Sequence, residues 1–73
     1  MKIAIENTNK IVSFNGIDCR VWEGDTEGGV PVIVFIPRIA VRNDLDTSQF
    51  EAELRETRAP SPDAEAWPLR MVL

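Results

Sequence analysis

The stretch Val-Pro-Val-Ile-Val-Phe-Ile-Pro-Arg-Ile-Ala-Val, residues 30–41, is the one segment of this 73-residue chain that is apolar and β-branched enough to centre a fold. Val and Ile favour strands, and Pro31 and Pro37 bracket a run far shorter than the roughly 20 apolar residues of a membrane-spanning helix. Successive side chains of a strand alternate between its faces, so both faces of this strand are apolar and need cover. We therefore predict a central strand, with residues 38–41 either continuing it after a bend or forming a second short strand.

Asn15-Gly16 separates two alternating segments, residues 10–14 and residues 17–22. This dipeptide suits a two-residue type I′ turn best, because both turn positions need a positive φ. The turn fixes the register of the strands, which gives the facing pairs Phe14 with Ile17, Ser13 with Asp18, Val12 with Cys19, and Ile11 with Arg20. One face then collects Val12, Phe14, Ile17, Cys19 and Val21, and the other carries Ile11, Ser13, Asp18, Arg20 and Trp22. Turn chemistry and hydrophobic pattern agree, so we predict a β-hairpin.

Two further strands are expected at the ends of the chain. Residues 1–6 alternate in the manner of a short strand, and Asn7-Thr8-Asn9 supplies turn chemistry after it. Residues 66–73 also alternate and end on apolar side chains. This pattern predicts a C-terminal strand that pairs at a sheet edge, either here or in a partner subunit.

A short helix is expected between the apolar stretch and the last strand. Thr47 or Ser48 is a candidate N-cap, and Ser48-Gln49-Phe50-Glu51 has the form of a capping box. Phe50 and Leu54 share one stripe of this helix, although the same residues also fit the alternation of a strand. The sequence thus predicts a single small domain over residues 1–73, of the α+β class and mainly β, with an antiparallel sheet of about four to five strands.

Length and composition narrow the classes of protein to which the chain can belong. A chain this short buries only about 60% of its unfolded surface. One cysteine and no histidine exclude an internal disulfide and leave a zinc site no plausible ligand set, so we expect a homo-oligomer to supply the missing stability. Twelve acidic and eight basic residues give a net charge of −4, which disfavours non-specific binding to nucleic acid. With no recognisable signal peptide or membrane span and a lone thiol, a cytoplasmic protein is expected.

No catalytic constellation is complete in this sequence. The usual general base is missing because there is no histidine, and Ser13, Ser48 and Ser61 have no adjacent base. Cys19 is expected to face the core, and the pairs of carboxylates are explained by solvated surfaces. We therefore expect no enzyme, no cofactor and no metal site.

The candidate functional surface is the outward face of the hairpin. Arg20 and Trp22 lie side by side there, near Ile11, and arginine and tryptophan dominate the binding energy of protein interfaces. Arginines also flank the central strand, and acidic residues fill the loop that precedes it. The predicted binding residues are Arg20, Trp22, Glu23, Asp25, Glu27, Arg38 and Arg42. Two alternatives stay open: Trp22 only covers the sheet beneath the helix, or the surface stacks a base on Trp22 and holds a phosphate on an arginine.

Several short motifs resemble small accessory proteins that tailed phages and prophages encode. The motifs are Asn7-Thr8-Asn9-Lys10-Ile11-Val12, the Asn15-Gly16 turn before Val21-Trp22-Glu23-Gly24, Phe50-Glu51-Ala52-Glu53-Leu54, Ala59-Pro60-Ser61 and Pro68-Leu69-Arg70. The resemblance runs over most of the chain. It implies a protein made in the cytoplasm of an infected bacterium, in a group rich in small non-enzymatic inhibitors of host machinery and host immunity.

Three functions are compatible with such a protein. The first is a non-catalytic phage-type binding protein that inhibits or modulates a host protein complex, as an anti-defence or host-takeover factor whose acidic excess steers it toward a basic groove. The second is an oligomeric sponge that sequesters a small anionic signal such as a nucleotide, with Arg20, Arg38 or Arg42 from adjacent subunits. The third is a structural subunit of a virion or larger assembly.

Overall fold

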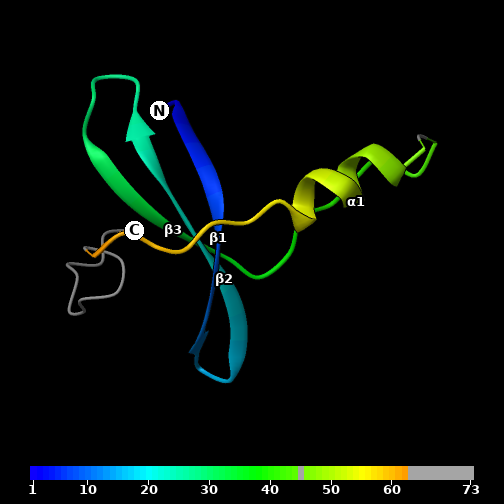
Figure 1. Cartoon of the computed structure of the whole chain (residues 1–73), viewed down its shortest axis with the longest axis horizontal. Helices are drawn as coiled ribbons and strands as arrows, with labels where there is room; N and C mark the ends of the chain where they lie inside the picture. Colours follow the sequence, from blue (N-terminus) through cyan, green and yellow to red (C-terminus); the bar gives the residue numbers. More distant parts are fainter. Residues whose placement is uncertain (45, 63–73) are drawn as a thin grey trace.

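The computed structural model describes residues 1–44 and 46–62 of the chain. Its elements are β1 (Ile3–Phe14), β2 (Ile17–Thr26), β3 (Pro31–Ile36) and α1 (Ser48–Arg55). The strands form one antiparallel sheet in the order β1-β2-β3 (Figure 1). The described part is thus mainly β with one short helix and has three strands, fewer than predicted, while the strand expected at residues 66–73 lies outside the described residues. Within that part, no helix is long and apolar enough to pass through a bilayer.

The predicted hairpin is confirmed in every facing pair. Four residues of β1 meet four residues of β2 in the pairs Phe14 with Ile17, Ser13 with Asp18, Val12 with Cys19, and Ile11 with Arg20. Asn15 and Gly16 have φ values of 51° and 80°, the left-handed conformation that this type of turn requires. Local turn chemistry therefore fixes the position of β2, onto which β3 then pairs.

The first two predicted strands are one strand, β1, and the prediction of a turn at Asn7-Thr8-Asn9 was wrong. The register shifts within β1, so that residues 8–10 have only Val21 opposite them on β2. This irregularity is a β-bulge, which bends a strand without ending it. Asparagine and threonine favour turns because their side chains bond to nearby backbone, and the same property serves a bulge.

Thr8 holds the bulge together from inside. Its side chain is fully buried, and its hydroxyl donates to the Val21 carbonyl oxygen at 2.7 Å and accepts from the Lys10 N–H at 3.2 Å. The guanidinium of Arg20 donates to the Thr8 carbonyl oxygen at 2.8 Å. A hydroxyl and a guanidinium thus replace the ladder bonds that the extra residues interrupt.

Within the described residues the apolar stretch forms an edge strand, which does not confirm the prediction that it lies at the centre of the fold. Among the described strands β3 pairs only with β2, which lies in the middle of the sheet. The strand ends at Ile36, so residues 38–41 neither continue it nor form a second strand. Pro37 has no N–H to donate to a ladder, which explains why β3 stops there.

One face of the sheet carries the core. Cys19 and Val21 of β2 are the most buried apolar residues of the described chain, at 6% and 0% exposure. Phe35, which lies opposite Val21, meets Phe14 edge to face with ring centroids 4.7 Å apart. This is the face that the hairpin register predicted, although Ile17 beside the turn is exposed.

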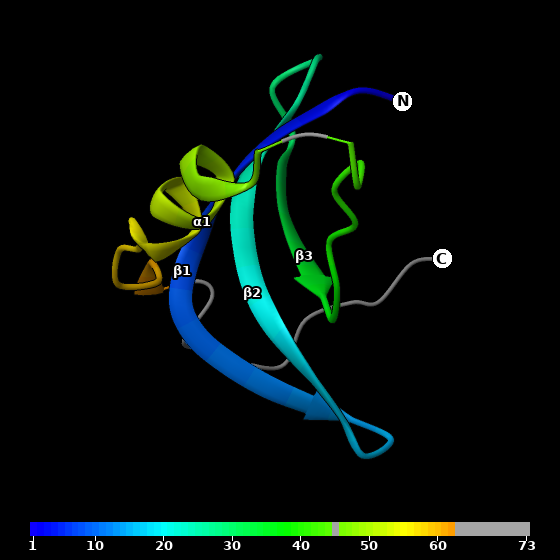
Figure 2. The same ribbon diagram turned by 90° about the vertical axis from the view of Figure 1, so that its right-hand side faces the viewer.

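α1 stands on the other side of the sheet, as Figures 1 and 2 show from two directions. The interpretation of this segment as a helix is confirmed. A carboxylate oxygen of Asp46 accepts the Ser48 N–H at 2.9 Å, in place of the predicted capping box. Phe50 and Leu54 are half-buried, and no residue of α1 is fully buried, so the helix lies on the sheet through few contacts.

Residues 56–61, which we call the strap, leave α1 and reach the outer edge of β1, where Arg58 forms a bridge with Thr8. The Asn9 N–H donates to the Arg58 carbonyl oxygen at 2.8 Å. Just before the strap, near the end of α1, the Asn7 side chain donates to the Leu54 carbonyl oxygen at 2.9 Å. The strap thereby joins the face that carries α1 to the core face of the sheet.

Candidate binding surface

A hollow beneath α1 gathers much of the predicted binding face. It has a volume of about 250 Å³ and is lined from β1 and β2, from the chain that follows β3, and from α1, which stands in front of the strands in Figure 2. We call it the Trp22 hollow. Its principal side chains are Ile11, Arg20, Trp22, Arg38, Phe50 and Leu54.

Strand geometry explains how this group forms. Arg20 and Trp22 share a face of β2 because they are two positions apart, and Ile11 lies opposite Arg20 on β1. The chain bends at Pro37, directly after β3, and this bend brings Arg38 to the same hollow. The structure therefore brings together four residues that the sequence had assigned to one surface, and adds two apolar side chains from α1.

The two arginines of the hollow differ in their surroundings. Arg20 is half-buried and held by its hydrogen bond to the Thr8 carbonyl oxygen. Arg38 is exposed, and no residue within 1–44 or 46–62 gives it a hydrogen bond or an ion pair. Arg20 is thus held in place by β1, whereas the exposed guanidinium of Arg38 is unpaired within the described residues.

Four of the predicted binding residues lie outside the hollow, and three of them, Arg42, Asp25 and Glu27, are exposed. Arg42 is paired with Asp44, with a nitrogen–oxygen distance of 2.9 Å, and both side chains are largely exposed. Asp25 is exposed near the end of β2, and Glu27 is exposed in the connection between β2 and β3. The structure does not bring these three residues to Arg20 and Trp22.

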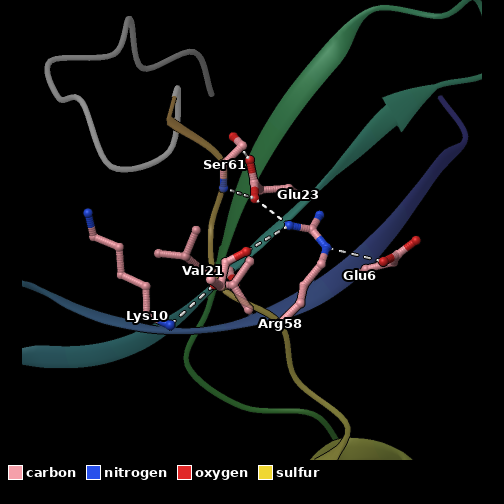
Figure 3. A network of polar contacts seen from close by, with 8 residues as sticks. Glu6, Lys10, Val21, Glu23, Arg58 and Ser61 are labelled. Carbon is pink, nitrogen blue, oxygen red and sulfur yellow. Dashed lines mark hydrogen bonds and ion pairs between the residues drawn. The ribbon is translucent and has the colours of Figure 1, made fainter.

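Glu23 lies on the core face of the sheet and is only 8% exposed. Its carboxylate accepts hydrogen bonds from Arg58 Nη1 at 2.8 Å, from the Ser61 N–H at 2.9 Å and from the Ser61 hydroxyl. Glu6 lies directly opposite Glu23 on β1, and Arg58 Nε reaches its carboxylate at 3.2 Å (Figure 3). We call this group of four residues the carboxylate clamp.

The clamp shifts the ionisation of its members. Burial raises the pKa of Glu23, but hydrogen bonds from Ser61 and from Arg58 outweigh it, so that this pKa lies below its ordinary value of 4.5. The pKa of Arg58 is raised, chiefly by its hydrogen bonds to Glu23 and Glu6. Both shifts favour the charged forms, so the clamp is an ion pair that fastens the strap to the sheet.

Reasoning from the sequence missed Arg58 and Ser61. Neither residue is among the binding residues predicted from the sequence. The available signal was Glu6 facing Glu23, because two carboxylates directly opposite each other call for a cation between them. That signal exists only once β1 is known to continue through its bulge.

The Trp22 hollow has the chemistry of a binding site. Its charged side chains are Arg20, Arg38 and Asp18, and apart from Cys19 the remaining lining is apolar. In the described ranges no three His, Cys, Asp or Glu side chains are grouped so as to hold a metal ion. Such a lining can hold an apolar group against Trp22 and an anion near Arg38.

A second hollow, of about 620 Å³, lies on the other side of the contact between α1 and Trp22. Ile5 and Asn7 of β1, Glu53 of α1 and Arg58 of the strap contribute to its lining. Trp22, Phe50 and Leu54 line both hollows, so these three side chains lie between the two hollows. The helix therefore meets the sheet at Trp22 and at Asn7, whose side chain bonds to the Leu54 carbonyl oxygen.

Comparison of the chain with protein-family models, with curated proteins and with solved structures gives no match. The function has to be argued from the surface itself.

Proposed function

We propose that the protein is a non-catalytic binding protein that occupies the surface of a host protein or protein complex in the bacterial cytoplasm and inhibits or modulates it, as a phage-type anti-defence or host-takeover factor. The observation that carries this proposal is the Trp22 hollow, which combines a tryptophan, two arginines and exposed aliphatic side chains. Tryptophan and arginine are the residues that most often dominate protein interfaces. The resemblance to accessory proteins of phages supplies the host setting.

The size of the hollow favours a protein partner over a small molecule. Pockets for small ligands usually have volumes of about 300–1,000 Å³. The Trp22 hollow, at about 250 Å³, is smaller, which suits a side chain that anchors a larger partner. The hollow is also partly open to solvent, as expected for a site that a protein surface covers.

The nucleotide sponge is a second candidate, favoured by the available guanidinium of Arg38 near Trp22. An aromatic face and an arginine together can stack a base and bind a phosphate. Arg20 and Arg38 line the hollow, whereas Arg42 lies outside it. Calorimetry with a panel of cyclic nucleotides tests the candidate, and the absence of heat with every member contradicts it.

Affinity capture with matched variants tests the leading proposal. The wild-type chain and the Trp22→Ala, Arg38→Glu and Arg42→Glu variants are used as baits in a bacterial lysate, and bound proteins are identified by mass spectrometry. We expect a host protein that the wild type and Arg42→Glu retain and that the other two variants lose. A partner that all four baits retain equally contradicts a role for the hollow. Circular dichroism of each bait excludes loss of folding as the cause.

A further inference from the structure

We infer that the Trp22 hollow recognises an acidic-apolar peptide segment, in which one large aliphatic or aromatic side chain enters the hollow and a neighbouring carboxylate binds Arg38. This inference rests on the proposed function and names the chemistry of the partner.

The lining of the hollow selects an apolar anchor. Ile11 and Ile39 contribute to it although they are 51% and 43% exposed, so apolar surface is left open to water. Phe50 and Leu54 of α1 extend this surface from above. Burying a large apolar side chain against it removes apolar area of both molecules from water. The available volume holds one such side chain.

The charges of the hollow select an anion beside that anchor. Two arginines face one aspartate, Asp18, so the hollow is positive in a chain whose net charge is −4. Arg20 already donates to the Thr8 carbonyl oxygen, whereas Arg38 has no partner in the described ranges. A carboxylate next to the anchor is therefore best placed at Arg38. A basic group beside the anchor would be disfavoured, because Asp18 is the one acidic side chain of the lining and two arginines would repel that group.

Short synthetic peptides provide the test. The probes are capped pentapeptides with a central leucine between two glutamates, and controls in which the glutamates become glutamines or lysines or the leucine becomes serine. The readout is the indole N–H resonance of Trp22 in the ¹⁵N-labelled full chain, assigned with a Trp67→Phe variant. We expect saturable shifts only with the leucine–glutamate peptide, with a dissociation constant on the order of millimolar for so small an anchor.

Variants of the chain separate the roles of the charges. Arg38→Gln is expected to weaken the leucine–glutamate peptide by about fivefold, the effect of losing an exposed ion pair. Asp18→Asn is expected to strengthen it, because a like charge is removed. Arg42→Gln is the matched control and leaves binding unchanged. Amide spectra show that each variant keeps the wild-type fold.

The outcomes distinguish this inference from the proposed function. Equal binding of the glutamine peptide, or no effect of Arg38→Gln, overturns the anionic part, and equal binding of the serine peptide overturns the anchor. Shifts of Trp22 with protein concentration alone show that a second copy fills the hollow, which also overturns the inference. A captured host protein that depends on Trp22, with no response to any peptide, overturns the inference and leaves the proposed function standing. A peptide response without any Trp22-dependent host protein overturns the proposed function alone.

Discussion

Arg58 lies between two carboxylates that face each other across β1 and β2. Glu6 and Glu23 form a directly opposed pair, which on its own destabilises a sheet. The guanidinium binds both, and Ser61 completes the hydrogen bonds of Glu23. A local conflict in the sheet is thus resolved by a residue from the far end of the chain, and the strap is fastened by the same bonds.

Loss of the guanidinium leaves Glu23 buried beside a like charge. For Arg58→Gln we expect the free energy of unfolding to fall by about 1–2 kcal/mol, toward the low end for a charged pair because the Arg58 side chain is 42% exposed. Glu6→Gln is the control, since its side chain is 76% exposed and its loss changes stability by less than about 0.5 kcal/mol. Urea denaturation measures both, and an equal effect of the two changes contradicts the clamp.

The lowered pKa of Glu23 makes stability depend on pH. The folded state holds the ionised carboxylate better than the unfolded state, so this contribution is present above the ordinary pKa of 4.5 and disappears as the pH falls through the lower pKa of the folded protein. We expect Glu23→Gln to lose less stability than the wild type between neutral and acidic pH. Asp46, whose pKa is lowered by the backbone hydrogen bond from Ser48, continues to titrate in both proteins. Urea midpoints at several pH values provide the measurement, and parallel curves for the two proteins refute this prediction.

At the level of elements, the sequence predicted those strands and turns that are determined by residues close together in the chain. The hairpin was predictable because Asn15-Gly16 and its flanking alternation act within a few residues. The continuation of β1 through Asn7-Thr8-Asn9 was not, because the bulge depends on Arg20 and on backbone contacts with the strap. Apolar content alone predicted residues 30–41 at the centre of the sheet, whereas β3 lies at the edge of the three described strands.

The candidate site likewise contains residues that local sequence patterns predicted and residues whose place depends on distant parts of the chain. Arg20, Trp22 and Ile11 were predictable as one surface from strand alternation, since they follow from the hairpin register. Arg38 joins them in the hollow through the bend after β3. Glu23 was assigned to an acidic loop, and its burial depends on Arg58, 35 positions away in the chain. Long-range partners of this kind leave no periodic signal in a sequence.

Gly24 provides a test of the β1–β2 pairing. A Cβ at this position would collide with the Ala4 carbonyl oxygen of β1, so the two backbones are in close contact there. We expect Gly24→Ala to lower the free energy of unfolding by about 2–3 kcal/mol, as overpacking does. Gly28→Ala is the matched control, because the nearest atom to its added Cβ is Thr26 Oγ1 at 4.0 Å. If the two variants unfold at the same denaturant concentration, the close pairing of the strands at Gly24 is wrong.

On the scale of the whole molecule, the core is small. Of the apolar residues that the structure describes, only Cys19 and Val21 are buried, while Ile3, Ile17 and Val30 are 42%, 57% and 59% exposed. Such a chain gains stability when copies cover each other. We expect the sedimentation coefficient and the thermal midpoint of the pure protein to rise with its concentration. Values that stay constant over a wide range of concentration contradict self-association.

The path of the strap also sets an order of events during folding. The hairpin joins neighbours in the chain, whereas Arg58 and Glu6 are 52 positions apart, and distant contacts form late because closing a long loop costs entropy. Arg58→Gln should therefore speed unfolding and leave the refolding rate nearly unchanged, which stopped-flow fluorescence measures. During synthesis the ribosome adds every residue of the hairpin before it adds the guanidinium that joins Glu6 to Glu23.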